Sequence, residues 1–235
     1  MQTEHTQHLQ SIETHFDAWD RYKRIVENNY MKHRELYTHL QELIDQLLSR
    51  PFSMLELGCG DAAVSAKVLT NTAITSYKAI DLSSQALALA EQNLANLTCT
   101  KTLIQGDFLA NIKNETENFD IIFTGFALHH LQTPEKQIFL NQCKKILKPD
   151  GLIAVIDIFR QDNESRDTFI KRYSDNSQRL YHAISAAEKA ASLKHMQEAD
   201  FPESMPSFKT LITQSGFSKI LKTVEYEFHG FISFL

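Results

Sequence analysis

Three acidic residues in this chain follow apolar stretches at places where strands are expected to end. They are Glu56, Asp81 and Asp107, and a glycine pair, Gly58 and Gly60, comes directly after the first of them. Glycine suits this position because the backbone must turn sharply and let a ligand approach without a Cβ in the way. A strand, a tight glycine turn and the start of a helix are the place where α/β folds bind nucleotide-like ligands.

The glycine turn by itself also fits a dinucleotide-binding motif. Gly58, Gly60 and Ala63 match the relaxed form G-x-G-x-x-G/A, and Asp81 follows at a suitable distance to bind a ribose. Glu56 argues against that ligand, because a carboxylate beside a helix N-terminus would repel a pyrophosphate. A nicotinamide-dependent oxidoreductase is therefore an alternative that Glu56 disfavours.

Acids at three successive strand ends suit a ligand with no phosphate, several hydroxyl and amino donors, and a positive charge. S-adenosylmethionine is such a ligand. Asp81 can accept hydrogen bonds from two vicinal ribose hydroxyls, and Asp107 can accept one from the adenine amino group. Leu82 and Phe108, each directly after its acid, can enclose the adenine ring. Glu56 would favour the cationic end of the ligand, directly or through water.

At this point the chain resembles the class I S-adenosylmethionine-dependent methyltransferases over roughly residues 50 to 158. The stretches that carry the resemblance are LELGCG (55–60), AIDLS (79–83), GDF (106–108), FDIIFTGFALHHL (119–131) and KPDGLI (148–153). The resemblance implies an α/β fold with a Rossmann-like, seven-stranded, mainly parallel sheet and helices on both faces. The last strand would be antiparallel and inserted between its neighbours. The family often has a third glycine where this chain has Ala62, and an alanine should be tolerated there.

The resemblance also implies which residues bind S-adenosylmethionine and release S-adenosylhomocysteine. Glu56 and the glycine turn would line the methionine end, with Cys59 a small residue tolerated beside the ligand. Thr124 and Gly125 would offer backbone carbonyls to the α-amino group. The expected cofactor site comprises Glu56, Gly58, Cys59, Gly60, Asp81, Leu82, Asp107, Phe108, Thr124 and Gly125.

Methyl transfer from a sulfonium is an in-line displacement, so the protein mainly aligns the nucleophile, excludes water and in some cases removes a proton. His129 and His130 follow the fourth strand, where the acceptor should bind, and an imidazole there could take a proton from it. The alternative is that a histidine, His130 above all, only packs and fixes the loop. No metal site is predicted, since the N-terminal His5 and His8 lack a cysteine or carboxylate framework.

A small-molecule acceptor is the favoured interpretation. The stretch TGFA (124–127) lacks the Asn/Asp-Pro-Pro-aromatic turn of many amino methyltransferases, and no cysteine nucleophile lies near it. The net charge of −5 gives no general attraction to nucleic acid. An RNA or protein methyltransferase and a non-catalytic, cofactor-binding partner subunit stay as alternatives. The oligomeric state is left open, a homodimer included.

The apolar periodicity predicts alternating strands and helices. Strands are expected at 52–57, 77–81, 99–105, 119–124, 152–158, 217–223 and 225–235, with a bulge at His229-Gly230 in the last. Helices are expected at 16–48, 61–69, 83–96, 134–147 and 204–215, with Asp61 and Ser83 as helix caps. Alternation of this kind implies a mainly parallel sheet that is covered on both faces.

The chain of 235 residues is expected to divide into an N-terminal tail and helical cap (1–50) and a methyltransferase domain (51–235). Residues 160–201 break the alternation and are read as a helical insertion that acts as a lid. Side chains of the cap and lid that could face the acceptor are Tyr22, Tyr30, Arg166, Arg172, Tyr173 and His182.

Three scattered cysteines, Cys59, Cys99 and Cys143, form no CxxC pair, which favours a cytoplasmic protein with free thiols. No apolar run approaches the roughly 20 residues that span a bilayer, so no membrane contact is expected.

Overall fold

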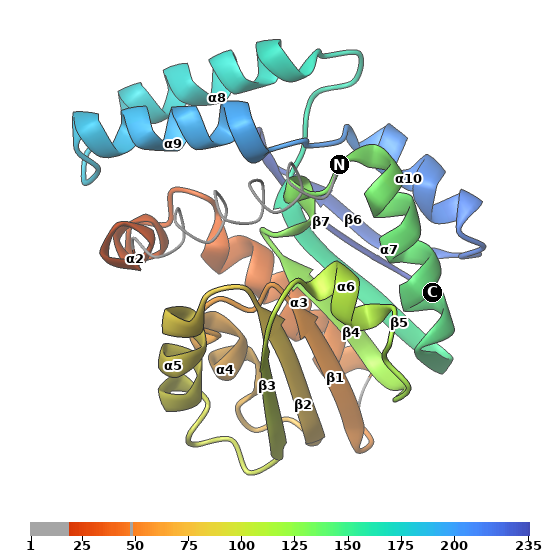
Figure 1. Ribbon diagram of the computed structural model, residues 1–235. Coiled ribbons are helices and arrows are strands. Elements are labelled where there is room, and N and C mark those ends of the chain that lie inside the picture. The colour runs from red at the N-terminus through yellow and green to blue at the C-terminus, as the bar shows by residue number, and fades with distance from the viewer. Residues whose placement is uncertain (1–18, 48) are drawn as a thin grey trace.

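The computed structural model describes residues 19–47 and 49–235, and it is built on a single seven-stranded sheet. The strands are β1 (Phe52–Leu57), β2 (Ile74–Asp81), β3 (Thr100–Gln105), β4 (Phe119–Gly125), β5 (Leu147–Ile158), β6 (Ile220–Glu225) and β7 (His229–Phe234). They lie in the order β3-β2-β1-β4-β5-β7-β6 (Figure 1). β7 is antiparallel to both of its neighbours, and the other pairs are parallel. The expected Rossmann-like sheet with an inserted antiparallel last strand is confirmed.

Helices cover both faces of the sheet. They are α2 (Trp19–Glu27), α3 (His33–Leu47), α4 (Ala63–Leu69), α5 (Ser84–Asn93), α6 (Phe108–Ile112), η1 (Leu128–His130), α7 (Thr133–Lys145), α8 (Arg166–Leu180), α9 (Ala186–Ala199) and α10 (Met205–Gln214). α3, α4 and α5 pack on one face around one apolar core cluster, while α6, α7 and α10 pack on the other around a second (Figure 1). The central strands are therefore buried on both faces, which explains why β4 and the second half of β5 are mostly apolar and buried along almost their whole length.

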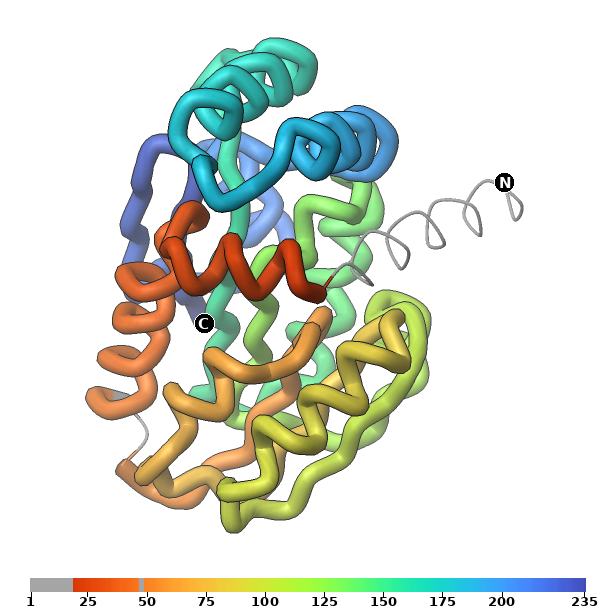
Figure 2. Tube along the Cα trace, turned by 90° about the vertical axis from the view of Figure 1, so that its left-hand side faces the viewer, coloured from red at the N-terminus to blue at the C-terminus, as the bar shows by residue number. Residues whose placement is uncertain are grey.

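Three further helices, α2, α8 and α9, lie across the carboxyl ends of the strands (Figure 1). α8 and α9 run side by side as a helical pair above the sheet, and α2 lies beneath them (Figure 2). Arg24 of α2 forms an ion pair with Glu188 of α9, and the ring of Tyr30 stacks on that of Tyr181 with 4.3 Å between their centroids. The helical pair confirms the helical content expected for residues 160–201.

Several boundaries differ from those expected from the sequence. The helical section expected at 16–48 is two helices, because Asn29 and Lys32 adopt left-handed backbone conformations (φ 54° and 59°) that interrupt it. Its first residues, Leu48 and the tail with its histidines lie outside the described residues. The helix α6 was not expected, and β5 begins at Leu147 rather than at residue 152.

The bulge expected at His229-Gly230 is wrong. Both residues pair regularly with β5, and the irregularity of register falls on β6 between Ile220 and Lys222. Close packing instead explains why residue 230 is a glycine, since a Cβ there would lie 2.9 Å from the ring of Phe159.

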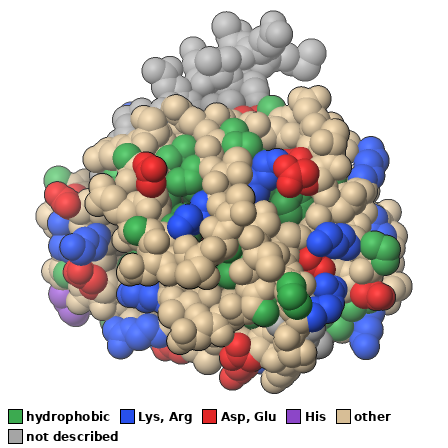
Figure 3. Space-filling view, turned by 90° about the horizontal axis from the view of Figure 1, so that it is seen from below, with side chains coloured by type: hydrophobic (Ala, Val, Ile, Leu, Met, Phe, Trp, Pro, Cys, Tyr) green, Lys and Arg blue, Asp and Glu red, His purple; other side chains and the backbone are tan. Residues whose placement is uncertain are grey.

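The outer surface mixes charges of both signs. On the face seen from below, basic and acidic side chains are interspersed with apolar ones (Figure 3). Among the described helices, none has the length and apolar character needed to cross a membrane.

Candidate active site

The turn after β1 is built for close approach of a ligand. Gly58 and Gly60 have φ values of +73° and +54°, a region that favours glycine. A Cβ on Gly58 would lie 2.4 Å from the Cβ of Ala127, so the two loops at the ends of β1 and β4 touch there. The amide of Gly58 donates to the carbonyl of Ile80 (2.8 Å), which holds the turn against the end of β2.

Ala62 occupies the position where the resembling family often has a third glycine. Its φ of 50° and ψ of 15° are left-handed, so the alanine is tolerated at a cost in backbone strain. The carboxylate of Asp61 accepts from the amide of Ala63 (3.1 Å), and Ser83 caps α5 by accepting from the amide of Ala86 (3.1 Å). The cap expected at Ser83 is therefore confirmed, whereas the one expected at Asp61 is wrong: the N-cap of α4 is Ala62, which has no side-chain cap, and Asp61 lies one residue before it.

Asp81 ties the glycine turn to the start of α5. One carboxylate oxygen accepts from the amide of Gly60 (2.7 Å) and the other from the amide of Ser83 (2.9 Å). Burial raises the pKa of Asp81, although these backbone donors oppose the shift. Asp107 plays a comparable local part, because it begins α6 and accepts from the amide of Leu109 (2.9 Å).

A cavity of about 900 Å³ opens at these strand ends. Eight of the ten residues expected at a cofactor site line it, namely Gly58, Cys59, Gly60, Asp81, Leu82, Asp107, Phe108 and Gly125. Trp19 and Tyr22 of α2 and Tyr37 of α3 also line it. Tyr22 was expected near the acceptor, whereas Trp19 and Tyr37 were not expected at either ligand.

Glu56 and Thr124 do not line this cavity. The Glu56 carboxylate is 2% exposed and accepts from the hydroxyls of Ser65 (2.8 Å) and Tyr77 (2.5 Å). Burial raises the pKa of Glu56 to about 7, since the charged form is poorly solvated. Thr124 is fully buried in β4, where it pairs with Val155 of β5.

A second cavity of about 870 Å³ adjoins the first. The two share Tyr22, Phe126 and His130 as a common wall. Apolar and aromatic side chains dominate the lining, among them Ile25, Met31, Ile158, Tyr173, Tyr181, Ile184, Leu193 and Met196. Phe126 has a φ of 55°, and strained backbone of this kind in a bulky residue is often found at functional sites.

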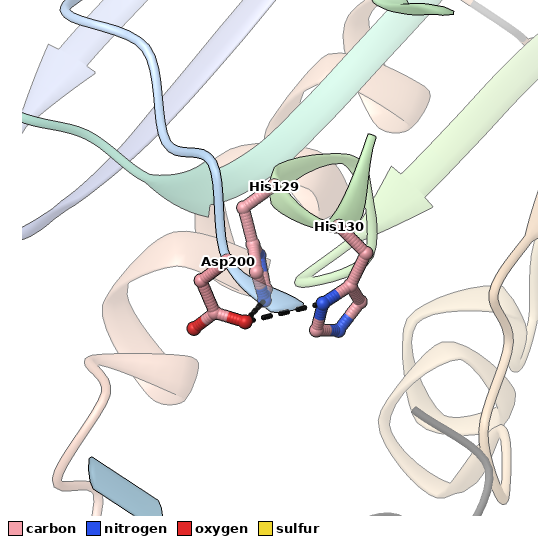
Figure 4. A group of neighbouring side chains, drawn as sticks. All are labelled: His129, His130 and Asp200. Atoms are coloured by element: carbon pink, nitrogen blue, oxygen red, sulfur yellow. Dashed lines mark ion pairs between the residues drawn. The ribbon is translucent and has the colours of Figure 1, made fainter. Parts of the chain in front are cut away.

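Buried histidines and carboxylates meet at the inner end of the second cavity. The Nδ1 atom of His129 lies 2.5 Å from Oδ1 of Asp157, at the end of β5, and the His129 amide donates to Oδ2 of the same carboxylate (2.9 Å). Asp200, which follows α9, points its Oδ1 toward both His129 and His130 (Figure 4). His195 of α9 approaches the same oxygen.

This group is electrostatically coupled. Burial lowers the pKa of His129, but the carboxylates of Asp157 and Asp200 outweigh it and raise that pKa above its usual value. Burial lowers the pKa of His130, and it lowers the pKa of His195 to about 3. Burial would raise the pKa of Asp200, yet the surrounding histidines hold it well below its usual range.

Comparisons with known proteins find a methyltransferase domain in this chain. Residues 54–151 match the family model of a methyltransferase domain. An uncharacterised methyltransferase of Bacillus cytotoxicus is 27% identical over 172 residues, which is 72% of this chain and 76% of that protein. These matches support a class I S-adenosylmethionine-dependent methyltransferase.

Solved structures share the fold of this methyltransferase. Magnesium protoporphyrin IX methyltransferase from Synechocystis, solved with bound S-adenosylhomocysteine, superposes with a TM-score of 0.66 at 11% identity, covering 97% of this chain and 98% of that one. An O-methyltransferase family protein from Burkholderia thailandensis superposes with a TM-score of 0.60 at 16% identity. That match covers 90% of this chain and 58% of that longer chain.

Three residues of the buried group around His129 and His130 were not predicted from the sequence, namely Asp157, Asp200 and His195. Asp157 carried a signal, since it is an acid within an otherwise apolar strand. Asp200 and His195 carried none, because Asp200 reaches His129 and His195 reaches the ring of His130 only after the helical pair has docked.

The expected lid residues divide in two. Tyr22 and Tyr173 line the second cavity. The remaining four serve packing or the surface: Tyr30 stacks on Tyr181, Arg166 donates to backbone carbonyls of α9 and of Asp200, Arg172 pairs with Glu164, and His182 is exposed.

Proposed function

We propose that this methyltransferase binds S-adenosylmethionine in the cavity at the glycine turn and transfers the methyl group to a small molecule in the second cavity. The observation that carries the proposal is the junction of the two cavities at Tyr22, Phe126 and His130. A cofactor on one side of that wall and an acceptor on the other would meet there, as in-line displacement requires. S-adenosylhomocysteine is the product.

In this proposal the strand-end acids bind the nucleoside. Asp81 accepts from the ribose hydroxyls with the lone pairs that its two backbone donors leave available. Asp107 accepts from the adenine amino group, and Leu82 and Phe108 enclose the ring.

The methionine end of the cofactor is assigned to the glycine turn and to the end of β4. Gly58, Cys59 and Gly60 line it, and the backbone carbonyls of Thr124 and Gly125 accept from the α-amino group. Glu56 acts on the cationic end through space, because its carboxylate is buried behind the turn and bound by two hydroxyls.

The acceptor is proposed to be a small molecule with an apolar body, since rings and aliphatic side chains form most of the second cavity. His129 and His130 activate its nucleophilic atom. We further propose that residues 1–50 and the insertion at 160–201 cap the methyltransferase domain at 51–235 and exclude water. The three free thiols favour a cytoplasmic setting.

Calorimetric titration of the full chain with S-adenosylmethionine, S-adenosylhomocysteine and NAD tests the cofactor assignment. Asp81→Asn keeps an acceptor oxygen for the turn but loses the charge, and we expect about 10- to 100-fold weaker binding of both sulfur ligands. Asp150→Asn, an exposed aspartate at the far end of β5, is the matched control and should bind as wild type does. Failure of wild type to bind either sulfur ligand, or a preference for NAD, would reject the proposal.

A turnover assay tests the acceptor. S-adenosylhomocysteine release is measured with a panel of apolar alcohols, phenols and amines. Full turnover by both His129→Ala and His130→Ala with the acceptor so identified would remove these two histidines from the mechanism.

A further inference from the structure

The histidine group has a geometry that hydrogen bonding alone does not require. Three imidazole nitrogens converge on one oxygen, Oδ1 of Asp200: Nδ1 of His130 at 3.2 Å, Nε2 of His195 at 3.5 Å and Nε2 of His129 at 3.8 Å. Neighbouring ligands on a tetrahedral metal ion with bonds of 2.0–2.1 Å are separated by about 3.3 Å. The spacing around Asp200 is therefore close to that of a coordination sphere.

From this geometry we propose that His129, His130 and Asp200 bind a divalent transition-metal ion at the acceptor end of the second cavity. The candidate ligand atoms of these three residues all lie within 4.8 Å of one another, so small side-chain shifts bring them to one ion (Figure 4). His195 is placed to supply a fourth ligand. This inference deepens the proposed function, on which its catalytic part rests.

The surroundings of His129 match those of a metal-bound histidine. Its Nδ1 is held by Asp157, which orients the ring and directs Nε2 toward Asp200. A carboxylate behind a ligating histidine is a recurrent arrangement, because it fixes the tautomer and makes the nitrogen a better donor. The backbone adds rigidity, since the amide of Phe201 donates to the carbonyl of His129 (2.6 Å) and keeps Asp200 beside it.

Charge and ligand type indicate the class of ion. Asp157 and Asp200 are 3% and 4% exposed, so their two negative charges balance a divalent cation in a buried place. Lys136, whose charge also reaches His129, is already paired with Glu203 (3.4 Å). Imidazole ligands favour zinc, iron, cobalt and related ions over magnesium and calcium, which take oxygen ligands.

The ion gives the acceptor side a defined chemistry. It would act there as a Lewis acid: an acceptor hydroxyl beside it would have a lowered pKa and would lose its proton to solvent at neutral pH. The oxygen then forms a bond to the methyl carbon with its own electron pair, while the carbon–sulfur bond breaks and leaves its pair on sulfur. The histidines hold the ion, and the ion holds the acceptor oxygen in line with the methyl group.

Metal binding is measured on the full chain without a histidine tag, after removal of metal with a chelator. Titration with Co²⁺, followed by visible absorption and calorimetry, should show one ion bound by this group per chain. We expect Asp200→Asn to weaken binding at least 100-fold, and Asp157→Asn to weaken it about 10- to 100-fold. His33→Gln removes a buried histidine outside both cavities and should bind as wild type does.

A further control separates this site from other effects. A variant with His5, His8 and His15 replaced by glutamine excludes binding by the N-terminal tail and should keep the ion.

The possible outcomes are distinct from those for the cofactor. Binding of S-adenosylhomocysteine by wild type and Asp200→Asn alike, with Co²⁺ and Zn²⁺ bound only by wild type, supports the metal site. No Co²⁺ or Zn²⁺ binding, or equal binding by Asp200→Asn, overturns it even when S-adenosylhomocysteine binds normally. In that case the histidines act on the acceptor without an ion.

Discussion

The close contact between Gly58 and Ala127 allows a rescue experiment on the loop that forms the cofactor cavity. In Gly58→Ala the new Cβ would lie 2.4 Å from the Cβ of Ala127, and the residue would have to keep a φ of +73°. Gly216→Ala imposes a similar strain, with a φ of +80°, but its Cβ would meet no atom within 4 Å. Only Gly58→Ala creates a steric clash. The difference between the two variants in the free energy of unfolding therefore measures the cost of that clash.

The expected magnitudes follow from these contacts. An alanine in the left-handed region costs about 1–2 kcal/mol, and restricting the unfolded chain returns about 0.4–1 kcal/mol. Gly216→Ala should therefore destabilise by about 1 kcal/mol or less. Overpacking adds about 1–3 kcal/mol, so Gly58→Ala should lose about 1–4 kcal/mol in all. For a chain of this length 1 kcal/mol corresponds to about 2–4 °C in Tm.

The double variant Gly58→Ala/Ala127→Gly removes the clashing atom. The next contact of the new Cβ is the Cα of Ala127 at 3.9 Å, which is ordinary van der Waals distance. Urea unfolding of wild type, both single variants and the double variant should show a favourable coupling of about 1–3 kcal/mol. Strictly additive effects, or equal losses in Gly58→Ala and Gly216→Ala, would refute the claim that these two loops touch.

Two predictions concern buried acids. The carboxylate of Asp120 lies 2.7 Å from Lys148 and 2.8 Å from Arg50, and these cations hold its pKa at about 2 against the effect of burial. The stability that the two ion pairs contribute is therefore present above the pKa of an aspartate in the unfolded chain, about 4, and is lost as pH falls toward 2. Asp120→Asn should cost about 1–2 kcal/mol at pH 7, after allowance for the partly exposed partners, and nothing at pH 2 in urea titrations. Burial raises the pKa of Glu56 to about 7, so the stability that its protonated form contributes is complete below pH 4.5 and is lost as pH rises through 7. Relative to Glu56→Gln, wild type should therefore lose about 3 kcal/mol between pH 4.5 and pH 8, and a pH-independent difference between the two would contradict the burial argument.

The cofactor side of the site was predictable because its determinants are local. Asp81 is the last residue of β2 and Asp107 lies two residues after the end of β3, and parallel strands bring their carboxyl ends to one edge. Glycine is the residue type that most readily adopts positive φ values, and Gly58 and Gly60 both adopt them. Wherever a residue's role depends on the few residues beside it, the linear pattern was sufficient.

Boundaries failed where the backbone conformation departed from the residue's ordinary preference. Asn28 and Asn29 follow the first helix directly and are a signal that the sequence analysis overlooked, whereas Lys32 adopts a positive φ without being glycine or asparagine. The short helix α6 begins at the N-cap Asp107 and has only five residues, which is too short for apolar periodicity to show.

The acceptor side depends on contacts between distant parts of the chain. Asp200 reaches His129 because the Phe201 amide binds the His129 carbonyl and because Arg166 donates to the Asp200 carbonyl (2.6 Å). None of these contacts has a spacing that a linear pattern can reveal.

The same dependence joins the lid to the chemistry. The helical pair covers the second cavity. It also brings Asp200 and His195 close to His129 and His130, which lie in η1, the next element after β4. A sequence change in α8 or α9 that alters docking would therefore move a charged group relative to His129 as well as reshape the acceptor's walls. In the proposed function, acceptor choice and acceptor activation are therefore coupled through the helical pair, and the wall of Tyr22, Phe126 and His130 that the two cavities share extends this dependence to the cofactor side.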